Sequence, residues 1–129
     1  MKLTGRLLVG FALLMFACAE DPQLNRESEL LGFWEYQTMT VNNQVKEFSN
    51  FLNISEDKTY DQCYLTGEWK LKGDRLELKF GGRVKSYQIV HLSSTRLVLK
   101  TSAVNGNDYN YSDIPEGTRL TIVQELSKK

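Results

Sequence analysis

The sequence has few of the residues that build metal centres, disulfide frameworks and nucleophilic triads. It contains 2 cysteines, 2 prolines and 1 histidine among 129 residues. This set cannot supply the usual nitrogen and sulfur ligands of zinc, and a Ser-His-Asp or Cys-His device would have to use His91. No nucleophile motif lies near His91 in the sequence, so we interpret it as structural. We therefore expect no enzymatic activity, no metal and no cofactor.

Neither sign of charge is in excess. Lys and Arg together number 16, as do Asp and Glu. The chain has no basic block that would neutralise a row of phosphates, which excludes nucleic acid as an expected partner. With 41% hydrophobic and 25% charged residues, the composition is typical of a folded globular chain. The length corresponds to one domain.

The longest apolar run is too short to span a membrane. It covers residues 7–17, whereas a transmembrane helix needs about 20 apolar residues. Lys2 and Arg6 precede the run and Cys18 follows it, which is typical of a secretory signal peptide. The segment from Leu14 to Cys18 resembles a bacterial lipobox. The resemblance implies a cleaved signal peptide over 1–17 and lipidation of Cys18 with palmitate-type chains. A plain signal peptide with Cys18 as a bystander is the alternative.

A lipidated Cys18 would make a membrane the chain's first partner. We then expect residues 18–29 to form a flexible polar tether, and the protein to sit in the cell envelope, at the outer membrane. Cys63 would be left without a partner in the mature chain. Because it falls within a predicted strand, we interpret it as a buried structural thiol. A reactive thiol, or one that pairs between molecules, is the alternative.

From residue 30 onward, apolar and polar residues alternate with the period of two that indicates β-strands. In the clearest hairpin, residues 68–72 and 75–80 flank Gly73 and Asp74, with Trp69, Leu71, Leu76, Leu78 and Phe80 on one face. Eight strands are expected, at residues 31–41, 48–55, 59–65, 68–72, 75–80, 84–92, 95–100 and 118–126.

Short turns between these strands favour an antiparallel meander. Closing the meander into a barrel removes both exposed edges, and eight strands enclose room for side chains or one small ligand. We therefore predict an all-β domain over 30–129, a single eight-stranded antiparallel barrel. One long connection, Ser102 to Gly117, is a candidate contact for a protein partner.

Several short segments carry a family resemblance. Residues 31–34 (LGFW), 54–60 (ISEDKTY), 67–71 (GEWKL) and 73–78 (GDRLEL) resemble the lipocalin-like domains of small envelope lipoproteins in Gram-negative bacteria. In lipocalins a Gly-x-Trp motif opens the first strand, and an Arg from near the end of the chain covers the Trp at the base of the barrel. The resemblance implies these roles for Gly32, Trp34 and Arg119, with Arg96 as the second candidate for the covering Arg.

The family resemblance also implies a pocket for a small apolar or amphipathic ligand. Barrel pockets are mainly apolar with a few polar groups, and buried tyrosines need a partner for each hydroxyl. The candidate ligand-binding residues are Tyr36, Tyr60, Trp69 and Tyr87. The alternative is a barrel filled by its own side chains, which acts as a protein-interaction or inhibitory module.

Overall fold

The computed structural model describes residues 22–129. The predicted signal peptide over 1–17 and the lipidation site Cys18 lie outside this part of the chain. Within it, no helix is long and apolar enough to cross a membrane. One α-helix, α2 (Pro22–Leu30), precedes the strands β1 (Gly32–Val41), β2 (Gln44–Lys46), β3 (Phe51–Ile54), β4 (Thr59–Gln62), β5 (Leu65–Lys72), β6 (Arg75–Phe80), β7 (Arg83–Leu92), β8 (Arg96–Val104) and β9 (Arg119–Lys128).

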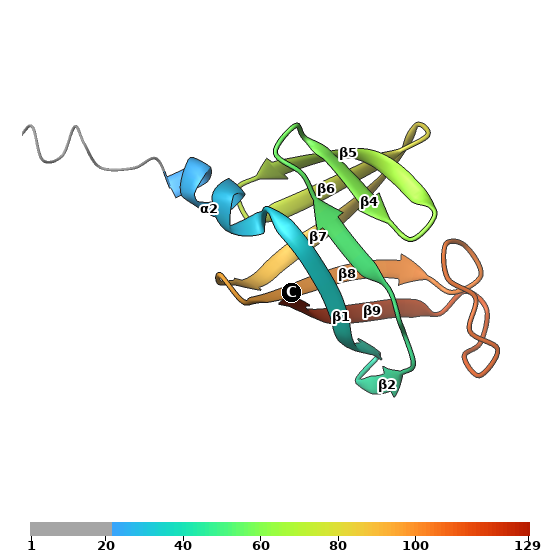
Figure 1. Ribbon diagram of the computed structural model, residues 1–129. Coiled ribbons are helices and arrows are strands. Elements are labelled where there is room, and N and C mark those ends of the chain that lie inside the picture. The colour runs from blue at the N-terminus through green and yellow to red at the C-terminus, as the bar shows by residue number, and fades with distance from the viewer. Residues whose placement is uncertain (1–21) are drawn as a thin grey trace, which may run out of the picture.

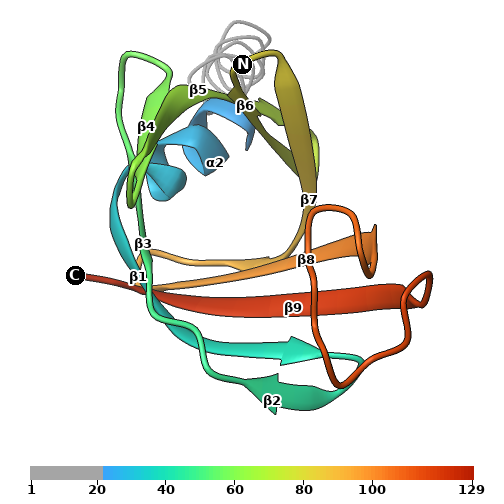
Figure 2. The ribbon, with the colours of Figure 1, turned by 90° about the vertical axis from the view of Figure 1, so that its right-hand side faces the viewer.

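The strands form one closed antiparallel barrel, as predicted (Figures 1 and 2). Each strand from β3 onward pairs with the next, and β9 returns to pair with β1. The short strand β2 pairs with the far half of β1, while β3 pairs with its near half. Strands β2 and β3 together therefore occupy one position in the wall, so the barrel has eight positions.

A tight turn at Asn42 and Asn43 separates β1 from β2. Both residues have positive φ, 50° and 67°, the combination that two-residue hairpin turns require and that Asn tolerates well. The sequence prediction placed no strand between Val41 and Phe48. The structure adds β2 there, which extends the pairing of β1 beyond the point where β3 begins.

The two ends of the barrel differ. At one end, called the base, α2 leads into the start of β1 beside the end of β9. At the other end, called the mouth, lie the turns after β1, β4 and β6 and the connection between β8 and β9. Figure 2 looks into the mouth, with α2 behind it.

The barrel interior contains two hydrophobic clusters. The larger one fills the base and middle and includes Trp34, Tyr36, Trp69 and Leu126. The smaller one lies nearer the mouth, where Met39, Val41, Leu120 and Ile122 are packed by partly buried side chains of the β8–β9 connection. Trp69, Leu71, Leu76 and Leu78 all point inward as predicted, but Phe80 is 40% exposed at the mouth end of β6. The inward-facing positions of β6 therefore end at Leu78, one inward position before the predicted Phe80.

Two predictions about the remaining chain were wrong. Cys63 is exposed and not buried, because it lies in a two-residue turn, with φ 53°, between Gln62 and Leu65. The predicted strand over 59–65 is thus interrupted by this turn. Residues 22–29 of the predicted flexible tether form most of α2, which is held to the barrel by the fully buried Leu30 and by an ion pair between Glu27 and Lys58.

Candidate ligand-binding site

The base of the barrel is sealed around Trp34. Its side chain is fully buried, and its indole Nε1 donates a hydrogen bond of 2.7 Å to the carbonyl oxygen of Leu30, the last residue of α2. The Nζ of Lys128 lies 4.8 Å from the centre of the Trp34 ring and donates to the carbonyl oxygen of Glu29 at 2.8 Å. A helix end, an indole and an ammonium group thus close this end together.

Backbone conformation and close packing both require the glycine of the Gly-x-Trp motif, Gly32. Gly32 has φ +128°, a conformation that side chains rarely adopt, and a Cβ there would lie 3.3 Å from Cε of Lys128. The missing side chain leaves room for the Lys128 stem to cross toward Trp34. Burial lowers the pKa of Lys128, and Glu29 partly opposes this effect. The implied roles of Gly32 and Trp34 at the base therefore fit the geometry.

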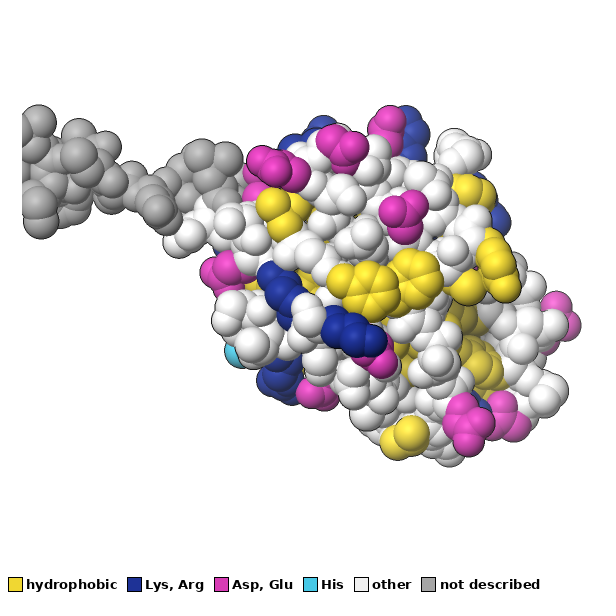
Figure 3. All heavy atoms as spheres, viewed as in Figure 1, with side chains coloured by type: hydrophobic (Ala, Val, Ile, Leu, Met, Phe, Trp, Pro, Cys, Tyr) yellow, Lys and Arg dark blue, Asp and Glu magenta, His cyan; other side chains and the backbone are white. Residues whose placement is uncertain are grey.

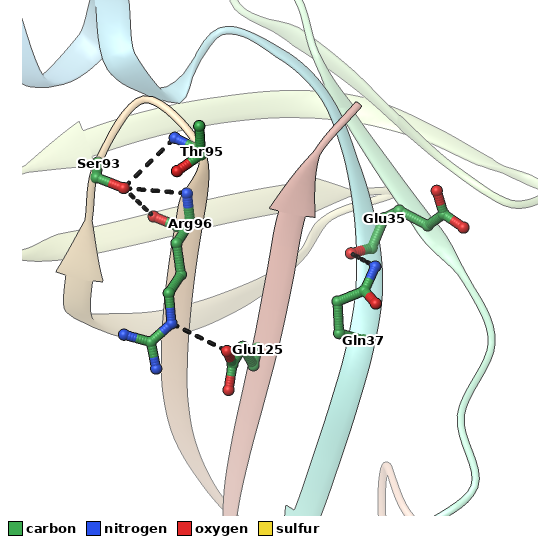
Figure 4. A network of polar contacts seen from close by, with 6 residues as sticks. All are labelled: Glu35, Gln37, Ser93, Thr95, Arg96 and Glu125. Carbon is green, nitrogen blue, oxygen red and sulfur yellow. Dashed lines mark hydrogen bonds and ion pairs between the residues drawn. The ribbon is translucent and has the colours of Figure 1, made fainter.

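The covering cation is Lys128, and neither predicted arginine takes that role. Arg119 begins β9 at the mouth, whereas Trp34 pairs with Lys128 at the other end of that strand. Arg119 is exposed, with its Nη1 3.5 Å from Oγ of Ser102. Arg96 lies nearer the base, but it points along the outer face to Glu125, 2.9 Å away (Figure 4). The prediction failed because the last strand continues to Lys128, beyond its predicted end at Leu126.

Three of the four predicted ligand-binding residues come together inside the barrel. Tyr36, Tyr60 and Tyr87 are 7%, 2% and 3% exposed. The hydroxyl of Tyr36 accepts a hydrogen bond of 2.8 Å from Nε2 of Gln62. The hydroxyl of Tyr87 interacts with that of Tyr109, a residue of the β8–β9 connection, and this interaction contributes to the pKa values of both. We call Tyr36, Tyr60, Tyr87 and Tyr109 the tyrosine cluster.

Burial sets the acidity of this cluster. It raises the pKa values of Tyr36 and Tyr87 far above the ordinary value of 10.0. The other hydroxyls of the cluster add to the shift, and for Tyr36 the hydrogen bond from Gln62 opposes it. All these hydroxyls therefore stay protonated at neutral pH and can both donate and accept hydrogen bonds.

Trp69 plays a different part from the tyrosines. Its indole Nε1 donates to the carbonyl oxygen of Ser55 at 2.8 Å, in the turn between β3 and β4 at the base. Nζ of Lys58 lies 4.3 Å from its ring centre. Because the indole N–H is already bonded within the protein, Trp69 contributes apolar surface to the interior and no free donor.

The barrel wall opens between β7 and β8. Pairing between these strands runs from the base only as far as Gln88 and Lys100. Toward the mouth, β7 continues to pair with β6 and β8 with β9, but not with each other. A cavity of about 540 Å³ lies there, and its lining includes Lys85, Tyr87, Thr101 and Tyr109. We call this gap the side opening; it reaches the tyrosine cluster through Tyr87 and Tyr109.

The connection between β8 and β9 covers part of the mouth. Strand β8 includes Ser102 to Val104, so the connection begins at Asn105, three residues later than predicted. The buried Asn105 side chain fixes its shape: Nδ2 donates to the carbonyl oxygens of Tyr111 and Ile114 at 3.0 and 2.8 Å, and Oδ1 accepts from the Tyr111 N–H at 2.8 Å. Nothing in the residue pattern distinguished Asn105 from an ordinary turn asparagine.

A closed antiparallel barrel with a sealed base and a polar cluster inside has the architecture of a small-ligand-binding calyx. Comparison with protein families agrees: the model of a lipocalin-like domain matches residues 27–99, more than half of the chain. The protein therefore belongs to the lipocalin-like domain family. No curated protein and no solved structure matches the chain. The matched range includes Tyr36, Tyr60 and Tyr87, but ends before the β8–β9 connection.

The assignment of Lys128 to the base predicts unequal effects of two substitutions. Lys128→Met keeps the apolar stem but removes the hydrogen bond to Glu29 and the contact of the ammonium group with Trp34. It should lower the free energy of unfolding by about 1–2 kcal/mol. Arg119→Met, at the exposed end of the same strand, should change it by less than about 0.5 kcal/mol. Urea denaturation measures both values; a larger loss for Arg119→Met would contradict the assignment.

The tyrosine cluster predicts instability at alkaline pH. Tyr36 and Tyr87 have raised pKa values when folded, so above pH 10 the unfolded chain releases protons that the folded chain keeps. The free energy of unfolding should hold up to about pH 10 and then fall, by at most about 1.4 kcal/mol per pH unit for each group. Urea denaturation at several pH values between 8 and 11.5 should show that the free energy of unfolding falls less steeply with pH in the double variant Tyr36→Phe/Tyr87→Phe than in the wild type. Tyr64→Phe, at a residue 97% exposed, is the control and should keep the wild-type slope.

Proposed function

We propose that this protein is a lipid-anchored envelope protein whose barrel binds a small amphipathic ligand near the mouth. The observation that carries the proposal is the tyrosine cluster beside a cavity of about 540 Å³. Ligand sites are typically apolar hollows with a few convergent polar groups. Here aromatic rings supply the apolar surface, and protonated hydroxyls supply the polar groups.

The distribution of polar groups inside the barrel supports a ligand in its middle, on the mouth side of Trp34. The base half is sealed by Trp34 and Leu30, both fully buried. In the middle of β9 the buried Gln124 carries an Oε1 without a hydrogen-bond partner in the described structure. An unpaired buried acceptor costs about 1–3 kcal/mol. A ligand that donates a hydrogen bond would remove that cost.

A filled barrel acting through protein contacts is the second candidate. Phe33 and Phe51 stack on the outer wall, with ring centres 5.1 Å apart, and Phe33 is 37% exposed. Figure 3 shows hydrophobic side chains gathered across this face of the molecule. An exposed apolar patch of this kind is a common feature of protein-interaction surfaces. The β8–β9 connection, predicted as a partner contact, lies at the mouth.

Native mass spectrometry tests the ligand directly. The sample is residues 19–129, which include α2 and every strand, purified without detergent from a bacterial periplasm. We expect an added mass that disappears on denaturation. Thr101→Phe, which fills the cavity, should lose the added mass, whereas Val90→Phe, on the 56% exposed Val90, should keep it. A bare wild-type chain in repeated preparations would favour the interaction module.

The anchor has a separate test in intact cells. Labelled palmitate should be incorporated into the full chain and into Cys63→Ser, but not into Cys18→Ser. Cys63 is the matched control because it is an exposed thiol in the folded domain. Label that persists in Cys18→Ser, or that is lost in Cys63→Ser, would contradict lipidation at Cys18.

A further inference from the structure

The side opening is a break in an otherwise continuous wall. Continuing the register beyond Gln88 and Lys100 would place Ser86 opposite Ser102, yet these residues do not pair across strands. A single side-chain bond spans the gap near its inner end, from Oγ1 of Thr101 to the carbonyl oxygen of Ser86 at 3.0 Å. The cavity is lined by residues of both strands and by Asp108 and Tyr109 of the β8–β9 connection. It therefore lies at the unpaired part of the wall, with inward-facing Tyr87 and outward-facing Gln88 both in its lining.

Three cations without carboxylate partners surround this opening. Lys85 shares the inner face of β7 with Tyr87, while Arg75 and Lys100 flank Gln88 on the outer face, in register with the last paired position. No carboxylate of the described residues lies within ion-pair distance of any of the three. The one acidic residue of the lining, Asp108, is paired with Arg83 at 2.9 Å.

A second hollow provides a comparison within the same molecule. It has about 580 Å³ and lies beside Trp69, and its charged lining is balanced: Glu27, Glu68 and Glu77 against Lys58, Lys70 and Lys79. Lys58 there is paired with Glu27. Of these two hollows, the side opening is the one that combines uncompensated positive charge with contact to the tyrosine cluster, which favours a ligand with an anionic group at that position.

The side opening is covered by a contact that can release without disturbing the barrel. Nζ of Lys85 lies 5.4 Å from the ring centre of Tyr109, whose hydroxyl interacts with that of Tyr87. Next to it, the Arg83–Asp108 pair is solvent-exposed, and such pairs contribute only about 0–1 kcal/mol. The same connection is held at the mouth by a second pair, between Lys46 and Asp113. The two ion pairs thus hold the connection at different places, one beside the side opening and one at the mouth.

We propose that the ligand enters and leaves sideways between β7 and β8, and that its anionic head group, a carboxylate or a phosphate, stays in the side opening against Lys85. The rest of the ligand lies inside the barrel, with its apolar surface against the rings of the tyrosine cluster. This inference rests on the proposed ligand-binding function. It adds the route, the charge of the head group and the residue that selects it.

Head-group selection is tested with three probes of equal chain length: decanoate, decyl phosphate and decanol. Binding to residues 19–129 is followed by tyrosine and tryptophan fluorescence. At least one anion should bind about tenfold tighter than decanol, and the better anion identifies the head group. Lys85→Met should lower the affinity for that anion about tenfold and leave the affinity for decanol unchanged. Lys129→Met, which removes the same charge from an exposed lysine beside Phe33 at the base, is the control and should bind as wild type.

The route is tested by opening each ion pair of the connection in turn. Asp108→Ala releases the side opening, and Asp113→Ala releases the mouth. Stopped-flow association of decanol, which is neutral and therefore insensitive to the changed charge, should be at least threefold faster in Asp108→Ala and unchanged in Asp113→Ala. Acceleration by Asp113→Ala alone, or by neither variant, would overturn the sideways route.

The outcomes separate this inference from the function on which it rests. Decanol that binds as tightly as both anions, or an equal loss in Lys129→Met and Lys85→Met, would overturn the head-group site while leaving a ligand-binding barrel. Failure of all three probes to bind the folded wild-type domain would remove the proposed function and this inference together.

Discussion

Strand β1 has to be paired along both edges at once, and the closed barrel depends on this. One edge pairs with β9 from Trp34 to Val41, and the other pairs with β3 and then β2. An irregularity between Tyr36 and Thr38 shifts the alternation, so that Tyr36 and Met39 both point inward. A slip of one residue on either edge would turn Trp34 toward solvent and expose the base. The position of Lys128 over Trp34 follows from the same register.

Tight closure at β1 contrasts with the incomplete pairing of β7 and β8. An extra residue between Ile89 and His91 shifts the β7 register near the base, and bulges of this kind bend a strand and increase its twist. Toward the mouth the two strands no longer pair, which leaves edge backbone in the wall. The β8–β9 connection covers that edge, and the Asn105 side chain fixes its shape through three backbone groups of Tyr111 and Ile114. One buried amide thus positions Tyr109 at the side opening.

Much of the barrel could be predicted from the sequence, because alternation and glycine-marked turns carry its register. The hairpin of β5 and β6 around Gly73 is an example. The turn at Cys63 and Tyr64 could not be predicted in this way, because neither residue is a usual turn former. For the site, burial of Tyr36, Tyr60 and Tyr87 follows from the alternation. Lys128 and the side opening do not, since they depend on where strand pairing ends, and pairing between distant segments leaves little local signal.

The two halves of the interior are built on different principles. In the base half every polar group of Trp34 and Trp69 is bonded within the protein, and leucines fill the remaining space; this half supplies stability. In the middle of the barrel, next to the apolar cluster of Met39, Val41, Leu120 and Ile122 at the mouth, tyrosine hydroxyls and Gln124 occupy inward positions, although apolar residues there would cost less to bury. Backbone pairing does not depend on which side chains project inward, so these polar groups are not needed to form the wall. A region that holds hydrogen-bonding groups in place of apolar side chains is better suited to recognising a ligand than to holding the barrel together.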